Sequence, residues 1–256
     1  MKKDAEKLIN FIDTSPTAFH VVENTEKILQ ENGFQRLKMS GKWEINKEGK
    51  YYVTKNGSSL VAFVVGKGDI AENGFKLIGT HTDSPTFRIK PDPEMVAGDN
   101  YLKLNTEVYG GPILNTWLDR PLSLAGRVSL KSDNPLKPKD RLVNFKDPLL
   151  VIPNLAIHLN REVNEGVELN KQNDILPVLR MVEENFEKEG YLLKLLAEEL
   201  GVAKEEILDF DLFLYDNQPG EIIGEKEDFI SIGKLDDLAM VEAGLRALTD
   251  TEALEA

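Results

Sequence analysis

The feature that most restricts the fold of this chain is the contrast between its middle and its two ends. From about residue 91 to residue 228, short β-prone runs are separated by turns rich in glycine and proline. On both sides of this middle, helical and strand-like patterns alternate, which is typical of an α/β domain. We therefore predict an α/β domain formed by residues 1–90 and 229–256, interrupted by a β-rich domain of residues 91–228.

Hydrophobic periodicity and turn residues predict where the individual elements lie. Helices are expected at residues 4–13, 16–32, 175–189, 191–200 and 239–249. Strands are expected at residues 51–54, 59–65, 75–79, 102–108, 124–130, 149–159, 209–215 and 229–232. The Asn56–Gly57 pair falls between the first two strands and favours a tight hairpin turn.

Polar motifs follow two of the predicted strands. His81 and Asp83 come directly after the strand at residues 75–79, and Asp236 and Asp237 lie between the strand at 229–232 and a helix. Ligands of open α/β sheets bind at such strand ends, and imidazole and carboxylate groups can hold zinc. From these residues alone, a turn capped by Asp83 is an equal alternative, and an aspartate at a helix start is an ordinary N-cap. Both interpretations stay open at this point.

Composition limits the partners and the chemistry. The chain has 256 residues, a net charge of −13 and no cysteine. The acidic balance argues against nucleic acid and anionic membranes as partners, because both attract a basic surface. The sequence contains neither an apolar run long enough to span a membrane nor a signal peptide. Without thiolates, a metal would need histidine and carboxylate ligands, and the composition is typical of a cytoplasmic protein.

Several blocks of the sequence resemble the aspartyl aminopeptidase family, which consists of metallo-aminopeptidases with a pair of metal ions. The blocks run through the whole chain in the family's order. They are residues 15–20 (SPTAFH), 81–85 (HTDSP), 109–111 (YGG), 117–122 (WLDRPL), 124–128 (LAGRV), 154–159 (NLAIHL) and 233–237 (GKLDD). The resemblance implies a zinc-peptidase-like α/β sheet with helices, of the phosphorylase/hydrolase type, interrupted by a β-rich dimerisation domain.

The resemblance also implies roles for the polar motifs. His81 resembles a metal ligand, Asp83 the catalytic carboxylate that supports it, and Asp236 the carboxylate that bridges two metals. Two Zn²⁺ ions per subunit are expected, with Co²⁺ or Mn²⁺ as possible substitutes, and no organic cofactor. Asp237 is interpreted as a helix cap that supports these ligands.

The two remaining histidines receive different interpretations. His20 lies among apolar residues of a helix and is expected to be structural. By sequence alone, His158 ends a strand and would be an ordinary polar residue. The resemblance implies instead a catalytic role across a dimer interface, where its imidazole could stabilise an oxyanion. It further implies a homo-oligomer in which dimers form a dodecamer, and the apolar edges of the β-rich domain would need such cover.

The implied function is removal of N-terminal residues, Asp or Glu by preference, from peptides by two-metal activation of water. Relatives extend beyond residue 256, and the resemblance locates the general base and the remaining metal ligands there. The acidic stretch with Glu252 and Glu255 does not match them. The chain alone is therefore expected to be incomplete and inactive. Two alternatives remain: a non-catalytic assembly module of the same fold, and a related two-metal hydrolase with another substrate.

Overall fold

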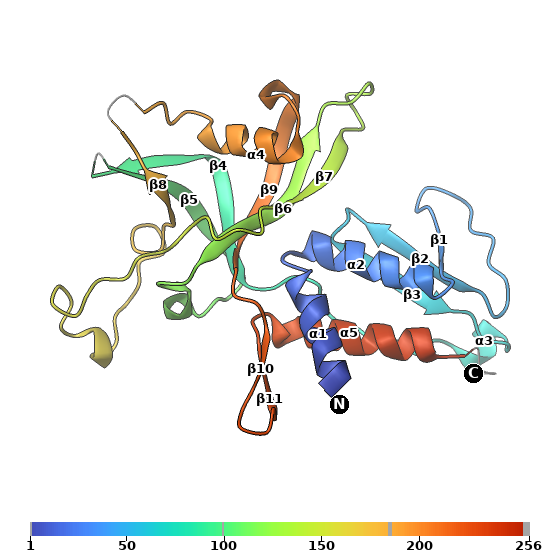
Figure 1. Cartoon of the computed structure of the whole chain (residues 1–256). Coiled ribbons are helices and arrows are strands. Elements are labelled where there is room, and N and C mark those ends of the chain that lie inside the picture. Colours follow the sequence, from blue (N-terminus) through green and yellow to red (C-terminus); the bar gives the residue numbers. More distant parts are fainter. Residues whose placement is uncertain (1, 99, 184–185, 253–256) are drawn as a thin grey trace. The chain divides into compact units, whose positions relative to one another are not determined.

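The computed structural model describes residues 2–98, 100–183 and 186–252, and the chain forms two compact units (Figure 1). Unit 1 consists of residues 1–84 and 219–256, and unit 2 is the continuous stretch Pro85–Gln218. The domain boundaries at residues 91 and 228 stay predictions. Within the described residues, no helix has the length and apolar character needed to cross a membrane.

Unit 1 combines helices with a small sheet. Its elements are α1 (Lys2–Asp13), α2 (Ala18–Glu31), β1 (Gln35–Arg36), β2 (Lys50–Lys55), β3 (Ser59–Val64), α3 (Ile70–Asn73), β10 (Glu221–Ile223), β11 (Phe229–Ser231) and α5 (Leu235–Asp250). Strands β1, β2 and β3 form a sheet in that order, in which β1 is parallel to β2 and β2 is antiparallel to β3. The predicted hairpin is confirmed, with Asn56 and Gly57 both at positive φ in its turn.

The core of unit 1 is built by elements from both segments of the chain. Helix α5 contributes Leu238, Val241 and Leu245, whose spacing of three and four residues places them on one face. They belong to the same buried cluster as Ile12 of α1 and Tyr52 of β2. Helix α5, which all of unit 2 separates from the N-terminal segment in sequence, is therefore part of the fold of that segment rather than an appendage.

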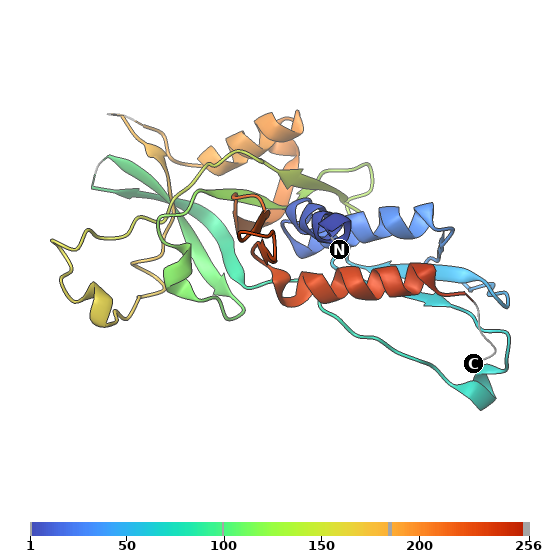
Figure 2. The ribbon, with the colours of Figure 1, turned by 60° about the horizontal axis from the view of Figure 1, so that its bottom comes forward.

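The strand predicted at residues 75–79 is absent. Residues 74–84 run as an irregular trace between α3 and the start of unit 2 (Figure 2). The local pattern is apolar and β-prone, but a strand also needs a neighbour, and no strand of the described chain pairs with this stretch.

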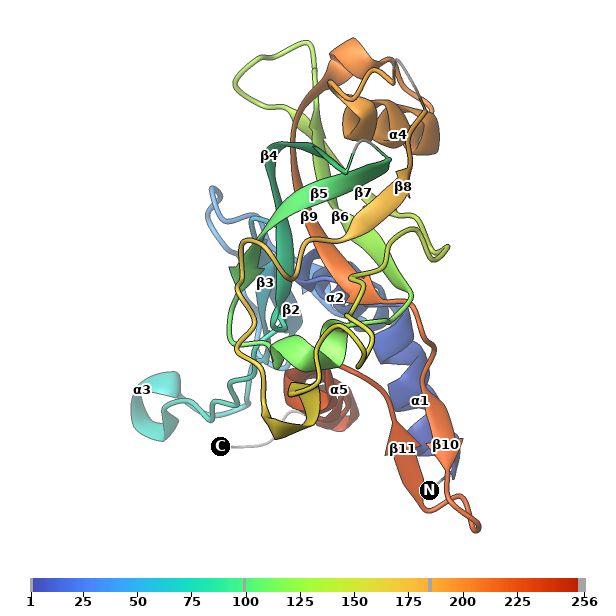
Figure 3. The ribbon, with the colours of Figure 1, turned by 90° about the vertical axis from the view of Figure 1, so that its left-hand side faces the viewer.

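Unit 2 is organised around one antiparallel sheet (Figure 3). Its elements are β4 (Thr86–Ala97), β5 (Tyr101–Tyr109), η1 (Leu114–Trp117), β6 (Leu122–Leu130), β7 (Lys139–Asn144), η2 (Val163–Glu165), β8 (Val178–Met181), α4 (Tyr191–Leu200), η3 (Lys204–Glu206) and β9 (Ile207–Asp216). The six strands lie in the order β7-β6-β9-β4-β5-β8, and every neighbouring pair is antiparallel.

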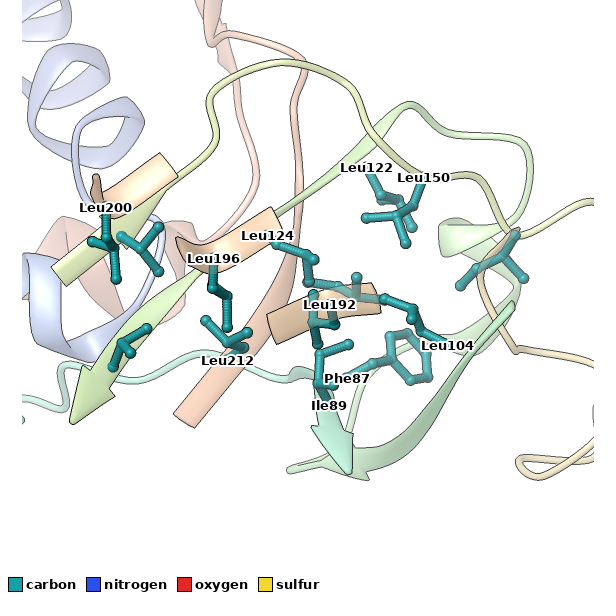
Figure 4. Packing of buried hydrophobic residues seen from close by; sticks show 14 of the residues in the cluster. Phe87, Ile89, Leu104, Leu122, Leu124, Leu150, Leu192, Leu196, Leu200 and Leu212 are labelled. Atoms are coloured by element: carbon teal, nitrogen blue, oxygen red, sulfur yellow. The ribbon is translucent and has the colours of Figure 1, made fainter. Parts of the chain in front are cut away.

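Helix α4 covers one face of this sheet. Leu192, Leu196 and Leu200 recur every four residues and are buried in the cluster that also holds Leu124 and Leu212 (Figure 4). The helix ends at Gly201, which adopts the left-handed conformation that glycine takes without steric cost. The predicted helix at 191–200 is confirmed, and it closes the core of unit 2.

Two further predictions for the middle of the chain are wrong. Residues 149–159 form only isolated bridges followed by a turn, so His158 does not end a strand. Within the stretch 175–189, where a helix was predicted, residues 178–181 form β8 against β5, and residues 184–185 lie outside the described part. The short apolar run at 175–179 has no helical length, and pairing with β5 decides its conformation.

Candidate metal centre

The start of α5 forms a turn that presents two adjacent carboxylates. Lys234 has a left-handed φ of 59°, and Asp236 and Asp237 have non-helical backbone angles and are joined by a cis peptide bond. The regular helix begins at Leu238, whose backbone N–H donates to the carbonyl oxygen of Lys234 at 3.2 Å. Both carboxylates therefore precede the helix instead of lying on one of its faces.

His81 lies beside these carboxylates, although more than 150 residues separate them in sequence. Its Nε2 atom is 3.2 Å from Oδ1 of Asp236 and 4.0 Å from Oδ2 of Asp237. Its Nδ1 atom is 3.0 Å from the carbonyl oxygen of Asp83 and 3.2 Å from the carboxylate Oδ1 of the same residue. The structure thus brings together all four residues of the two polar motifs.

Asp237 supports His81, as interpreted from the sequence, but it does so through the His81 backbone rather than as a cap of α5. Its Oδ2 atom accepts a hydrogen bond of 3.0 Å from the backbone N–H of His81, and its side chain is only 18% exposed. The carboxylate therefore ties the His81 segment to the start of α5. The sequence signal for this role was the second, adjacent aspartate, which a single N-cap does not require.

The surroundings of His81 act on its pKa in opposite directions. Partial loss of hydration lowers the pKa of the imidazole, whereas the Asp83 carbonyl, the Asp236 carboxylate and the charges of Asp237 and Asp83 raise it. The net pKa lies above the ordinary 6.5. The acceptors on both ring nitrogens account for this direction, because each favours the protonated ring.

The donor set suits a zinc ion. One ligand atom from each of His81, Asp236 and Asp237 lies within 4.8 Å of the other two. Imidazole nitrogen and carboxylate oxygen are both zinc ligands, and three protein ligands with an open position are typical of catalytic sites. The side chain of Asp236 is 96% exposed, so the cluster has an open side. The residues present therefore fit a divalent metal.

The group of possible ligands does not include the other two histidines. His20 is buried in α2 of unit 1, and its Nδ1 atom is 2.8 Å from Oγ1 of Thr17, in agreement with the structural role predicted for it. His158 is exposed in a turn of unit 2. Its predicted catalytic role stays a prediction.

Comparison with known proteins identifies the family that this chain resembles. The family model for aminopeptidase I zinc metalloproteases (M18) matches residues 11–255. A probable M18 family aminopeptidase 2 of Clostridium novyi (strain NT) is 57% identical over 254 residues, covering 99% of this chain and 59% of the relative. The chain thus spans less than two thirds of the length of such curated relatives.

Solved structures share the fold. A chain in the cryo-EM structure of the Ape4 and Nbr1 complex has a TM-score of 0.90 and 36% identity, and the match covers 97% of this chain and 50% of that one. The S. cerevesiae mApe1 dodecamer has a TM-score of 0.82 and 29% identity, covering 98% of this chain and 57% of its own. The zinc-peptidase-like α/β fold expected from the sequence is confirmed by these neighbours. With a family match that spans nearly all of its residues, this chain belongs to the M18 family of aminopeptidase I zinc metalloproteases.

Proposed function

We propose that this chain provides part of the active site of a zinc aminopeptidase that removes N-terminal residues from peptides. The observation that carries the proposal is the cluster of His81, Asp236 and Asp237 in a member of the M18 family. Zinc is the metal named in the family's description. The number of ions and their replacement by Co²⁺ or Mn²⁺ are part of the proposal.

The residues in and beside the cluster have distinct tasks. Asp83 would accept a hydrogen bond from the Nδ1–H of His81, which would leave the Nε2 lone pair facing the carboxylates, where a metal would be held. Asp237 fixes the His81 backbone, so the imidazole is positioned from two sides. Asp236 is the exposed carboxylate and is the candidate bridge between two ions. When bound, such a pair would polarise the scissile carbonyl and lower the pKa of water.

Zinc binding tests the assignment of these residues. The chain should take up Zn²⁺ in a competition titration against a fluorescent chelator, and Asp236→Ala should weaken the uptake at least about 10-fold, because a direct ligand is lost. Asp228→Ala removes an exposed carboxylate elsewhere in unit 1 and serves as the matched control. Equal zinc binding by both variants would remove Asp236 from the site.

Activity is best measured in a chimaera in which this chain replaces the matching 254 residues of the C. novyi relative. We expect hydrolysis of amino-acid nitroanilides by the chimaera, its loss in Asp236→Ala, and no activity of the chain alone. Faster cleavage of the Asp and Glu substrates than of the Leu and Lys substrates would support the proposed acidic preference. An inactive chimaera that still assembles would favour the non-catalytic assembly module.

We further propose that the protein forms a homo-oligomer, a dimer that assembles into a dodecamer. One structural neighbour is described as a dodecamer. In unit 2, Leu155, Ile157 and Leu159 are exposed around His158, and another subunit could cover these side chains. If His158 acts across that interface, mixing His158→Ala and Asp236→Ala chimaeras should restore part of the activity lost in each. Hybrid oligomers without activity would argue against the shared site.

A further inference from the structure

The hydroxyl group of Thr82 makes a contact outside the candidate metal centre. Thr82 stands between His81 and Asp83, whose Nδ1 and Oδ1 atoms lie 3.2 Å apart at the site. The Oγ1 atom of Thr82 instead donates a hydrogen bond of 2.7 Å to the carbonyl oxygen of Ser58. Thr82 and Ser58 are both half-buried. The three consecutive side chains therefore divide between two neighbours, two at the site and one at another element of unit 1.

The acceptor of this hydrogen bond lies in a well-fixed turn. Ser58 belongs to the tight connection between β2 and β3, and its backbone N–H donates to the carbonyl oxygen of Lys55 at 3.2 Å. The two strands pair residue by residue along the whole of β2. Tyr52 of β2 is fully buried in the core of unit 1. The carbonyl oxygen of Ser58 is therefore a fixed point, and the side chain of Thr82 binds to it.

The carboxylate half of the site is held by other contacts. The Nζ atom of Lys234 donates to the carbonyl oxygens of Ile12 and Ser15, at 3.2 and 3.1 Å, near the end of α1. The carbonyl oxygen of Lys234 in turn accepts the N–H of Leu238, where the regular helix α5 begins. The turn that carries Asp236 is therefore held against α1 by contacts that do not include the histidine segment.

His81 is thus held between two fixed elements. Its own backbone N–H donates to Asp237 at 3.0 Å, and the hydroxyl of the next residue, Thr82, donates to Ser58. Residues that hold a metal ligand matter because the ligand must stay within about 0.5 Å of its productive position. Loss of the Thr82 hydroxyl would free the His81 backbone on one side and leave the Ser58 carbonyl without this hydrogen bond.

We propose that Thr82 is a positioning residue of the metal centre, whose hydrogen bond to Ser58 sets the place of the His81 imidazole relative to Asp236 and Asp237. The hydroxyl acts through His81 and does not itself bind the metal. Threonine suits this task, because branching at Cβ restricts its χ1 rotamers and so directs the hydroxyl. The proposal rests on the proposed function and deepens it, since it adds a residue outside the group of possible ligands.

Three variants separate the hydroxyl from the rest of the side chain. Thr82→Val keeps the shape and removes the hydroxyl, whereas Thr82→Ser keeps the hydroxyl. Thr249→Val is the matched control, because the Oγ1 atom of half-buried Thr249 on α5 also donates to a backbone carbonyl, that of Arg246, at 3.0 Å. In the chelator competition, zinc affinity should fall about 10-fold in Thr82→Val and stay close to that of the unchanged chain in the other two variants.

Hydrogen exchange followed by NMR gives a second measurement, which needs no metal. In the metal-free chain, the His81 amide should exchange faster in Thr82→Val than in Thr82→Ser, because its hydrogen bond to Asp237 opens more often when the Thr82 contact is lost. The Leu238 amide belongs to the carboxylate half of the site and should keep its exchange rate in both variants. An unchanged rate at Leu238 also shows that α5 is still folded.

The possible outcomes distinguish this proposal from its alternatives. Equal exchange of the His81 amide in the two Thr82 variants would overturn it, and so would equal zinc affinities. Faster exchange at Leu238 as well, or an equal loss of zinc affinity in Thr249→Val, would overturn it too, since the hydroxyl would then serve the fold of unit 1 in general. If the unchanged chain takes up no zinc, the proposed function fails instead, and the two His81 exchange rates still decide the role of Thr82.

Discussion

His20 makes the stability of unit 1 depend on pH in a predictable direction. The residue is buried in α2 with 7% of its surface exposed, and its Nδ1 atom contacts Thr17 Oγ1 at 2.8 Å. Burial lowers the pKa of the imidazole from 6.5 to about 4, and Lys234 and Lys27 also lower it, against the opposing charge of Glu23. The ring is therefore neutral in the folded protein at pH 7 and also at pH 5.

The sign and the size of the effect follow from the two pKa values. Because the folded pKa lies below the unfolded one, the unfolded chain binds the proton first as the pH falls from 6.5 towards 4. Stability that is present above pH 6.5 is thus lost through this window. For one group, the linkage relation gives a loss of about 2 kcal/mol between pH 7 and pH 5.

Comparing proteins with and without His20 at two pH values separates the contribution of His20 to stability from the contributions of the many carboxylates. Urea unfolding at pH 7 and pH 5 is followed by the fluorescence of Trp43, which stacks on Phe63 in unit 1, in a Trp117→Phe background that removes the other tryptophan. The pH-dependent loss should be about 2 kcal/mol smaller in His20→Asn, which cannot titrate. His158→Asn replaces an exposed histidine and should change nothing. Equal losses with and without His20 would refute the reasoning.

Three other predictions follow from the structure. Gly126→Ala should destabilise unit 2 by about 2–3 kcal/mol in chemical unfolding, because the new methyl group would overlap the carbonyl oxygen of Asp211 on the neighbouring strand β9. Leu124→Ala should cost about 3 kcal/mol in the same assay, since Leu124 is fully buried in the core under α4. Asp83→Ala should weaken zinc binding by about 10-fold in a chelator competition, because His81 loses one of the acceptors that orient it; unchanged affinity would contradict that role.

Elements with a complete local signal could be predicted from the sequence. The Asn56–Gly57 hairpin and the helix closed by Gly201 carry both their periodicity and their end signals within about a dozen residues. Strand β4 was missed because Pro91 and Pro93 interrupt it. The structure accommodates them in a register shift between Ile89 and Glu94, so the strand continues past residues that cannot donate to its neighbour.

Errors arose where pairing decides the conformation. Residues 75–79 have strand composition without a partner in the described chain, whereas residues 178–181 form a strand because β5 lies beside them. Both stretches are short and apolar, and neither contains the information about which neighbour is present. Such conformations depend on tertiary context, which is why β propensity is a weak guide by itself.

The candidate site shows the same division between local and long-range information. The positions of His81 and Asp236 were predictable as chemistry at element boundaries, and the structure brings their side chains within 3.2 Å of each other. What the sequence could not show is how they are held. Asp237 was interpreted as a helix cap that supports the ligands, and its carboxylate provides that support by accepting a hydrogen bond from the His81 backbone. That single contact joins two segments more than 150 residues apart in sequence, and it fixes the backbone that carries the imidazole to the start of α5.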